Sequence, residues 1–269
     1  EIPNPKSNGD SIQKRKDYSM IEVAVEAAQA AGAILREHFG TELKVDQQKH
    51  YDVKLEVDRL CEERILEIIR RHCPDCGILA EESGQQDRPS PYTWIIDPLD
   101  GTANYFRGVP HFCTSIALQH REETILGVVY DPLGDELFVA EKDRGAHLNG
   151  APIHVSAITR IEQSFVTCGF MKTEDAIRRG LKRFERLAFR ASKMRIMGSA
   201  ALNLCYVAMG RFDGYVEYGI RAWDLAAGAL LTTEAGGRVD ARLTPDGGYD
   251  VLATNGTLHG ELERLMNNE

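Results

Sequence analysis

The sequence predicts a mixed α/β protein, with an α+β N-terminal part and a three-layer α/β C-terminal part. Two helical segments open the chain, a run of short strand-like segments follows, and strands then alternate with helices to the end. Helices followed by consecutive strands favour a largely antiparallel α+β layer, whereas alternation favours an α/β unit. The polar residues at 1–17 predict a flexible leader. The change from consecutive strands to alternation predicts two domains, 18–153 and 154–269.

The N-terminal elements follow from apolar periodicity and from the residues that end it. Helical spacing predicts helices over 18–39 and 58–72, which Gly40 and Pro74 end. Short apolar runs between turn residues predict strands at 78–80, 93–96, 115–118, 126–130 and 137–140. Asn149-Gly150 then predicts a tight turn.

The C-terminal elements alternate in type. Strands are expected at 165–168, 194–197, 214–217 and 251–254, and helices at 173–190, 199–209, 223–235 and the C-terminus. Gly210 and Gly236-Gly237 stand where glycine commonly ends a helix. This order predicts a sheet covered by helices on both faces.

Composition restricts the class of protein. The chain of 269 residues is 43% hydrophobic and 27% charged, which is typical of a soluble globular protein. A formal net charge of −9 argues against a general nucleic-acid or membrane-surface role, although bound divalent cations would still attract a small anionic substrate. The six cysteines show no secreted disulfide spacing and predict reduced thiols in a cytoplasm. One Cys73-Pro74-Asp75-Cys76 segment makes a regulatory disulfide a hypothesis, whereas structural zinc would need a second pair.

The most informative segment runs from Trp94 to Thr102. An apolar strand ends there in Asp97 and Asp100, which flank Pro98-Leu99. Two carboxylates at the exit of a buried strand repel each other unless a cation lies between them. The residues from Gly101 onward could open a helix whose free N–H groups face the same point. Ligands for a hard cation beside an anion cradle predict chemistry on a phosphate.

Further carboxylates stand at predicted strand and helix ends. They are Glu81 and Glu82 after the strand at 78–80, Asp58 at the start of the second helix, and Asp224 in the first turn of the helix at 223–235. Oxygen ligands of this kind suit Mg²⁺ or Mn²⁺. Taken singly, Asp58 is better explained as a helix cap and Asp224 as a turn former.

Five segments resemble the inositol monophosphatase family of metal-dependent, lithium-sensitive sugar phosphatases. They are Ala80-Glu81-Glu82-Ser83, Trp94-Ile95-Ile96-Asp97-Pro98-Leu99-Asp100-Gly101-Thr102, Gly198-Ser199-Ala200-Ala201, Trp223-Asp224-Leu225-Ala226-Ala227-Gly228 and Glu234-Ala235-Gly236-Gly237. They occur in the family's order, and the likeness extends from about Met20 to the C-terminus. The resemblance implies a layered αβαβα sandwich, a homodimer, and hydrolysis of a small polyol phosphate, with inositol 1-phosphate as the expected substrate.

The resemblance also implies roles for individual residues. Metal ligands fall on Glu81, Asp97, the Leu99 carbonyl, Asp100 and Asp224, which would hold two or three Mg²⁺ ions, with Mn²⁺ as a substitute. Catalytic roles in activating the attacking water fall on Glu81, Thr102 and Asp58. Substrate contacts fall on Asp100, Gly101, Thr102, Gly198, Ser199, Ala200, Glu217 and Asp224. One departure is Leu55, which replaces a threonine that the family usually has three residues before Asp58.

Several alternatives stay open at this point. Within the family, the substrate could instead be fructose-1,6-bisphosphate, histidinol phosphate or a 3′-phosphoadenosine nucleotide. A role of another class is regulatory, because some bacterial members are similar to a transcription antitermination partner that binds RNA polymerase. The complete set of carboxylates predicts that phosphatase activity is retained in either case.

Overall fold

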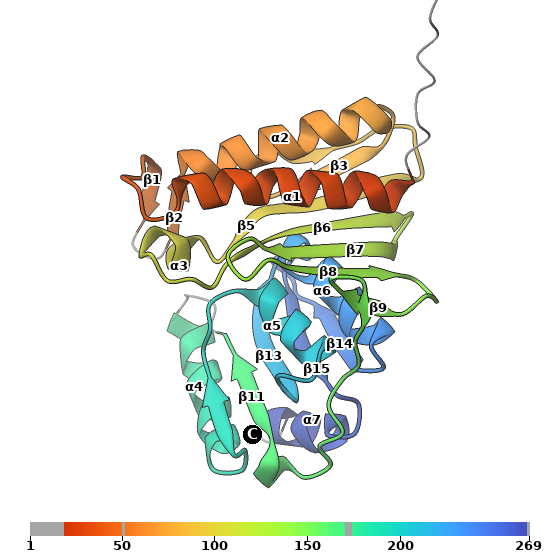
Figure 1. Cartoon of the computed structure of the whole chain (residues 1–269). Helices are drawn as coiled ribbons and strands as arrows, with labels where there is room; N and C mark the ends of the chain where they lie inside the picture. The colour runs from red at the N-terminus through yellow and green to blue at the C-terminus, as the bar shows by residue number, and fades with distance from the viewer. Residues whose placement is uncertain (1–18, 50–51, 170–173, 268–269) are drawn as a thin grey trace, which may run out of the picture.

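The computed structural model describes residues 19–49, 52–169 and 174–267, so the leader predicted over 1–17 lies outside the described residues. Its elements stack in five layers, in the order helices, sheet, helices, sheet, helices (Figure 1). The predicted mixed α/β class and αβαβα sandwich are confirmed. No helix within the described residues is long and apolar enough to cross a membrane.

The first layer is the helix pair α1 (Met20–His38) and α2 (Glu56–His72). Ser19 caps α1, since its hydroxyl accepts from the N–H of Glu22 while the Glu22 carboxylate accepts from the N–H of Ser19. The buried face of each helix shares one core with the upper face of the larger sheet, around Trp94 and Ile96. This packing fixes the start of α2, where Asp58 lies.

The larger sheet has eight strands in the order β10-β9-β8-β7-β6-β5-β3-β4. Their bounds are β3 (Gly77–Ala80), β4 (Gly84–Gln86), β5 (Tyr92–Asp100), β6 (Cys113–His120), β7 (Glu123–Asp131), β8 (Glu136–Glu141), β9 (Ala146–Leu148) and β10 (Ala151–Pro152). All neighbours are antiparallel except β3 and β5, which are parallel. The largely antiparallel sheet is therefore confirmed. A separate ribbon joins β1 (Val45–Lys49) to β2 (Asp52–Leu55).

The middle layer consists of α5 (Ala200–Ala208) and α6 (Ala222–Glu234). Both helices are apolar around much of their circumference because one side packs on the larger sheet and the other on the smaller sheet. The contact is close at Gly127 of β7, where a Cβ atom would lie 2.8 Å from the carbonyl oxygen of Ala227 in α6. Because these helices contact both sheets, the division at residue 153 stays a prediction.

The smaller sheet has the order β12-β11-β13-β15-β14 and is mixed. Its strands are β11 (Phe165–Cys168), β12 (Lys193–Arg195), β13 (Gly214–Ile220), β14 (Arg238–Leu243) and β15 (Tyr249–Thr254). β11 runs parallel to β12 and β13, whereas β15 is antiparallel to β13 and β14. A short 3₁₀ helix (Ile161–Gln163) precedes the sheet, and α4 (Glu174–Ala188) and α7 (His259–Asn267) cover its outer face.

One pair of cysteines differs from the expectation of reduced thiols. Cys73 and Cys76 form a disulfide between the end of α2 and the start of β3, with Cα atoms 5.5 Å apart. The turn after the helix brings the two residues within the distance that a disulfide requires. The other four cysteines are free and buried. The pairing is therefore present, and a regulatory role for it stays a prediction.

Candidate active site

Carboxylates from β5 and α6 meet below the end of the larger sheet. Asp97 and Asp100 end β5, Asp224 lies in the first turn of α6, and one oxygen atom from each lies within 4.8 Å of the other two. Asp97 and Asp100 are buried, and Asp224 is partly buried. Such a group of oxygen ligands at short distance is suited to a divalent cation.

Glu81 joins this group through the pairing of β3 with β5. The strands are parallel with Ala80 opposite Ile96, and the N–H of Glu81 donates to the carbonyl of Ile96 at 3.1 Å. Glu81 therefore follows β3 at the level of Asp97 in the buried part of β5. The order of strands, rather than nearness in sequence, brings these two acids together.

The pKa values of Glu81, Asp97, Asp100 and Asp224 indicate whether these acids suit a bound cation. Burial and then the charge of Asp224 raise the pKa of Glu81 to about 8, and burial and then the charge of Asp100 raise the pKa of Asp224 to about 7. Burial and then the charge of Glu81 raise the pKa of Asp97 well above its usual range, and burial also raises the pKa of Asp100. Buried carboxylates this close repel one another unless protons or a cation neutralise them. A bound cation would replace these protons, so the donor set fits a divalent metal.

The turn after Asp97 places the Leu99 carbonyl and the Thr102 hydroxyl. The N–H of Leu99 donates to Asp97 Oδ1 at 3.0 Å, and pairing with β6 is interrupted between Asp97 and Asp100. Thr102 Oγ1 donates to the carbonyl of Leu99 at 2.9 Å. Since that bond uses the hydroxyl proton, the Thr102 oxygen stays an acceptor, the role needed to orient a water O–H.

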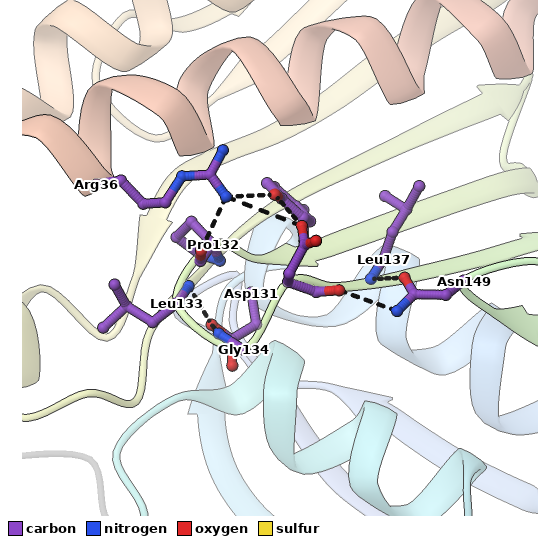
Figure 2. Close-up of polar contacts among 9 residues, drawn as sticks. Arg36, Asp131, Pro132, Leu133, Gly134, Leu137 and Asn149 are labelled. Carbon is purple, nitrogen blue, oxygen red and sulfur yellow. Dashed lines mark hydrogen bonds and ion pairs between the residues drawn. The ribbon is translucent and has the colours of Figure 1, made fainter.

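A second Asp-Pro-Leu turn shows which part of the motif matters. At the end of β7, Asp131 accepts from the N–H of Leu133 at 2.9 Å and of Gly134 at 3.0 Å (Figure 2). The next acid, Asp135, is exposed and pairs with Arg36 of α1 at 3.8 Å. The same three residues therefore build a turn here whose neighbouring acids are paired with arginines, Asp135 with Arg36 and Glu136 with Arg211.

The N-terminus of α5 holds Asp100. Ser199 Oγ donates to Asp100 Oδ2 at 2.5 Å, and the N–H groups of Ala200 and Ala201 donate to the same carboxylate at 3.3 Å and 2.7 Å. These bonds lower the pKa of Asp100 against the larger effect of burial. The predicted substrate contacts at Ser199 and Ala200 are thus already bonded to a predicted metal ligand. Gly198, which precedes them, has a φ of 84° and is exposed.

Asp58 lies at the start of α2, buried, with its Oδ2 accepting from the N–H of Leu55 at 2.7 Å. Leu55 offers no hydroxyl, so only this backbone half of a reciprocal cap is possible at the position where the family has threonine. The charge of Asp58 also contributes to the raised pKa of Glu81, which indicates that the two acids are near each other. Its partnership with Thr102 stays a prediction.

Glu217 lies on β13 with its carboxylate fixed by two neighbours. The Tyr215 hydroxyl donates to Glu217 Oε2 at 2.6 Å, and a Cβ atom on Gly169 would lie 2.0 Å from the Glu217 carboxylate. Burial, then the charge of Glu217, and then the charges of Asp100 and Asp224 raise the pKa of Tyr215, so this pair lies close to the acidic cluster.

Three residues that support the site were missed from the sequence. Tyr215 holds Glu217, and Glu62 of α2 accepts from the N–H groups of Glu82 and Ser83. Asn104 of α3 (Thr102–Phe106) donates to the carbonyls of His111 and Met197, both at 2.8 Å, and so joins the two halves of the chain. Of the three, only Glu62 could have been found from the sequence, because it is an acid between apolar residues on the buried face of a helix.

Metal affinity and stability should depend on pH in opposite directions. In the metal-free protein the raised pKa values mean that Glu81 and Asp224 bind more protons folded than unfolded, so stability should fall as pH rises towards 8. Cation binding needs the deprotonated groups, so affinity should rise over the same range with release of protons. Thermal melts from pH 5.5 to 8.5, with chelator and with Mg²⁺, measure both effects. An Mg²⁺ affinity that does not change with pH would contradict this assignment.

The chain is similar to known proteins over most of its length. A model described as the inositol monophosphatase family matches residues 16–267. An inositol-1-monophosphatase of Synechocystis is 41% identical over 91% of this chain and 88% of that protein. A Nus factor SuhB of Pasteurella multocida is 39% identical over 92% of each chain. The crystal structure of an extragenic suppressor protein suhB from Bartonella henselae has a TM-score of 0.87 at 35% identity, covering 93% of this chain and 99% of the other.

Proposed function

This chain belongs to the inositol monophosphatase family of phosphatases, and on that premise we propose that it hydrolyses a small polyol phosphate, foremost inositol 1-phosphate, with Mg²⁺ as its cofactor. One observation carries the proposal. Asp97, Asp100 and Asp224 converge within 4.8 Å, beside a Glu81 whose pKa is raised to about 8. Mn²⁺ is expected to substitute, since it takes the same ligands.

The residues divide the work by their positions. Glu81, Asp97, the Leu99 carbonyl, Asp100 and Asp224 would hold the cations. When bound, these supply Lewis-acid activation of water and stabilise negative charge on the phosphoryl and leaving oxygens.

The remaining site residues act on the water and the substrate. The acceptor oxygen of Thr102, with Asp58 and Glu81, orients the attacking water. The N–H groups of Gly101 and Thr102 stand at the start of α3, where they have no partner within the helix, and bind phosphate oxygens. Glu217 accepts a hydrogen bond from a hydroxyl of the polyol, and no covalent phosphoenzyme is needed.

A substrate panel tests this proposal. We expect phosphate release in Mg²⁺ to show the highest kcat/KM for inositol 1-phosphate, above fructose-1,6-bisphosphate, histidinol phosphate and a 3′-phosphoadenosine nucleotide. Lithium should inhibit the reaction. A higher kcat/KM for another member of the panel would move the substrate assignment to that compound and leave the metal site unaffected.

A second candidate function follows from the name of one relative. The Pasteurella multocida protein is a Nus factor, so we propose that a regulatory role beside RNA polymerase can coexist with phosphatase activity in this chain. Purified protein that binds RNA polymerase but releases no phosphate from any compound of the panel would favour regulation alone. The homodimer and the cytoplasmic location implied above are part of this proposal, and sedimentation of the purified protein tests the former.

A further inference from the structure

Glu62 is a buried carboxylate one helical turn beyond Asp58. It lies on the inner face of α2 and is 3% exposed. Burying a carboxylate is costly unless hydrogen bonds or a cation compensate for the lost water. Among the described residues, no lysine or arginine forms an ion pair with Glu62. The hydrogen bonds that compensate for its burial come from the turn that follows β3.

Both oxygens of Glu62 are used in that turn. Oε2 accepts from the N–H of Glu82 at 2.9 Å, and Oε1 accepts from the N–H of Ser83, also at 2.9 Å. Two consecutive N–H groups on one carboxylate form charge-assisted bonds that fix both the position and the direction of the backbone. The turn between β3 and β4 therefore depends on a side chain of α2.

The residue between this anchor and the sheet is Glu81. On one side its own N–H is bonded to Ile96 of β5, next to Asp97. On the other side the following N–H, that of Glu82, is bonded to Glu62. The backbone of Glu81 is thus held at both ends, which limits where its carboxylate can lie relative to Asp97 and Asp224.

We propose that Glu62 is a positioning residue of the cation site, which acts through the Glu82 and Ser83 N–H groups to hold Glu81 in place for the metal. The inference rests on the proposed function, because it takes Glu81 to be a ligand. Partners that orient metal ligands typically change metal affinity by about 10- to 100-fold when they are replaced. Glu62 contacts neither the cation nor the substrate in this account.

The chain contains a matched control for the structural part of this role. Glu234, the last residue of α6, accepts from the N–H groups of Asp143 and Gly145, both at 2.9 Å. It is likewise a helix carboxylate that holds a turn between two strands, here β8 and β9. Its turn carries none of the proposed ligands, so Glu234→Gln removes the charge and one of the two acceptor oxygens, as Glu62→Gln does, without changing the cation site.

The experiment measures Mn²⁺ binding calorimetrically and the Mg²⁺ concentration for half-maximal turnover, in wild type, Glu62→Gln, Glu62→Ala and Glu234→Gln. In Glu62→Gln we expect the Kd for Mn²⁺ and the half-maximal Mg²⁺ concentration each to rise about 10-fold or more. Both values should rise further in Glu62→Ala and stay at wild-type values in Glu234→Gln. Turnover at saturating metal should recover to within a few-fold of wild type in Glu62→Gln. The loss should persist in 0.5 M KCl, where a long-range charge effect would be screened.

The outcomes separate the two levels of the account. Wild-type Mn²⁺ affinity in a folded Glu62→Gln, with only a lower Tm, would show a structural role and overturn the inference. Wild-type protein that binds no Mn²⁺ would overturn the proposed function itself. If Glu62→Ala does not fold, Glu62→Gln, which keeps the side-chain volume, decides alone.

Discussion

Replacing Asp97 with asparagine is expected to lower turnover by about 10³-fold or more, because a metal site contributes several kcal/mol and each 1.4 kcal/mol is tenfold in rate. Asp97 is buried, and one of its oxygen atoms lies within 4.8 Å of oxygen atoms of Asp100 and Asp224. Asparagine keeps the size but offers a neutral oxygen, so the site loses a charge at its centre. The measurement is phosphate release in saturating Mg²⁺, together with calorimetric Mn²⁺ binding, which should weaken in parallel.

The second Asp-Pro-Leu turn supplies the control for this substitution. Asp131→Asn changes the same residue type, also buried at the end of a strand and also bonded to the N–H of the leucine two residues later. It should lower Tm while turnover stays within a few-fold of wild type. Equal losses of turnover in the two variants would mean that Asp97 acts only by forming its turn.

Substituting Gly101 with alanine is expected to cause the second largest loss, about 100-fold in turnover together with a lower Tm. Gly101 has a φ of 94°, and a Cβ atom there would lie 2.9 Å from the backbone oxygen of His111. A left-handed conformation costs a residue with a side chain about 1–2 kcal/mol, and the contact with fixed backbone forces the segment to shift. Thr102 and the N–H groups that face the phosphate would move with it, and a displacement of about 1 Å can cost about 100-fold in rate.

Gly40→Ala isolates the strain from the displacement. Gly40 also has a positive φ, of 77°, but a Cβ atom there would meet nothing within 4 Å. This variant should lose stability by strain alone and keep its turnover. Comparison of Tm and kcat for the two variants, measured side by side, checks the argument. Gly101→Ala with wild-type kcat would show that the start of α3 does not position reacting groups.

The sequence predicts those parts of the site in which each element has a recognisable local sequence pattern. Asp97 and Asp100 follow an apolar run that ends in proline and glycine, and Asp224 follows a tryptophan at a helix start. An apolar run shows where a buried strand ends, and a carboxylate directly after such a run is easy to recognise. That such acids converge became visible through the resemblance, since periodicity alone does not give the order of strands in a sheet.

The parts that could not be predicted depend on contacts between distant segments. Asn104 is unremarkable in sequence, yet it donates to the carbonyl of Met197, 93 residues away. The edge strand β14 was missed because Arg238, Asp240 and Arg242 alternate with its apolar residues, so it has no continuous apolar run like those of the buried strands. Asp131 is the converse case, since its sequence copies that of Asp97 but its neighbours in space are different.

The most direct test of the central claim is phosphate release from inositol 1-phosphate by protein that has been stripped of metal with chelator. If the carboxylates of Glu81, Asp97, Asp100 and Asp224 form a cation site that performs the chemistry, the stripped protein should show no turnover above background. Added Mg²⁺ should then restore it in proportion to metal bound. Full turnover in the stripped protein, with chelator still present and no bound metal detected, would contradict the account.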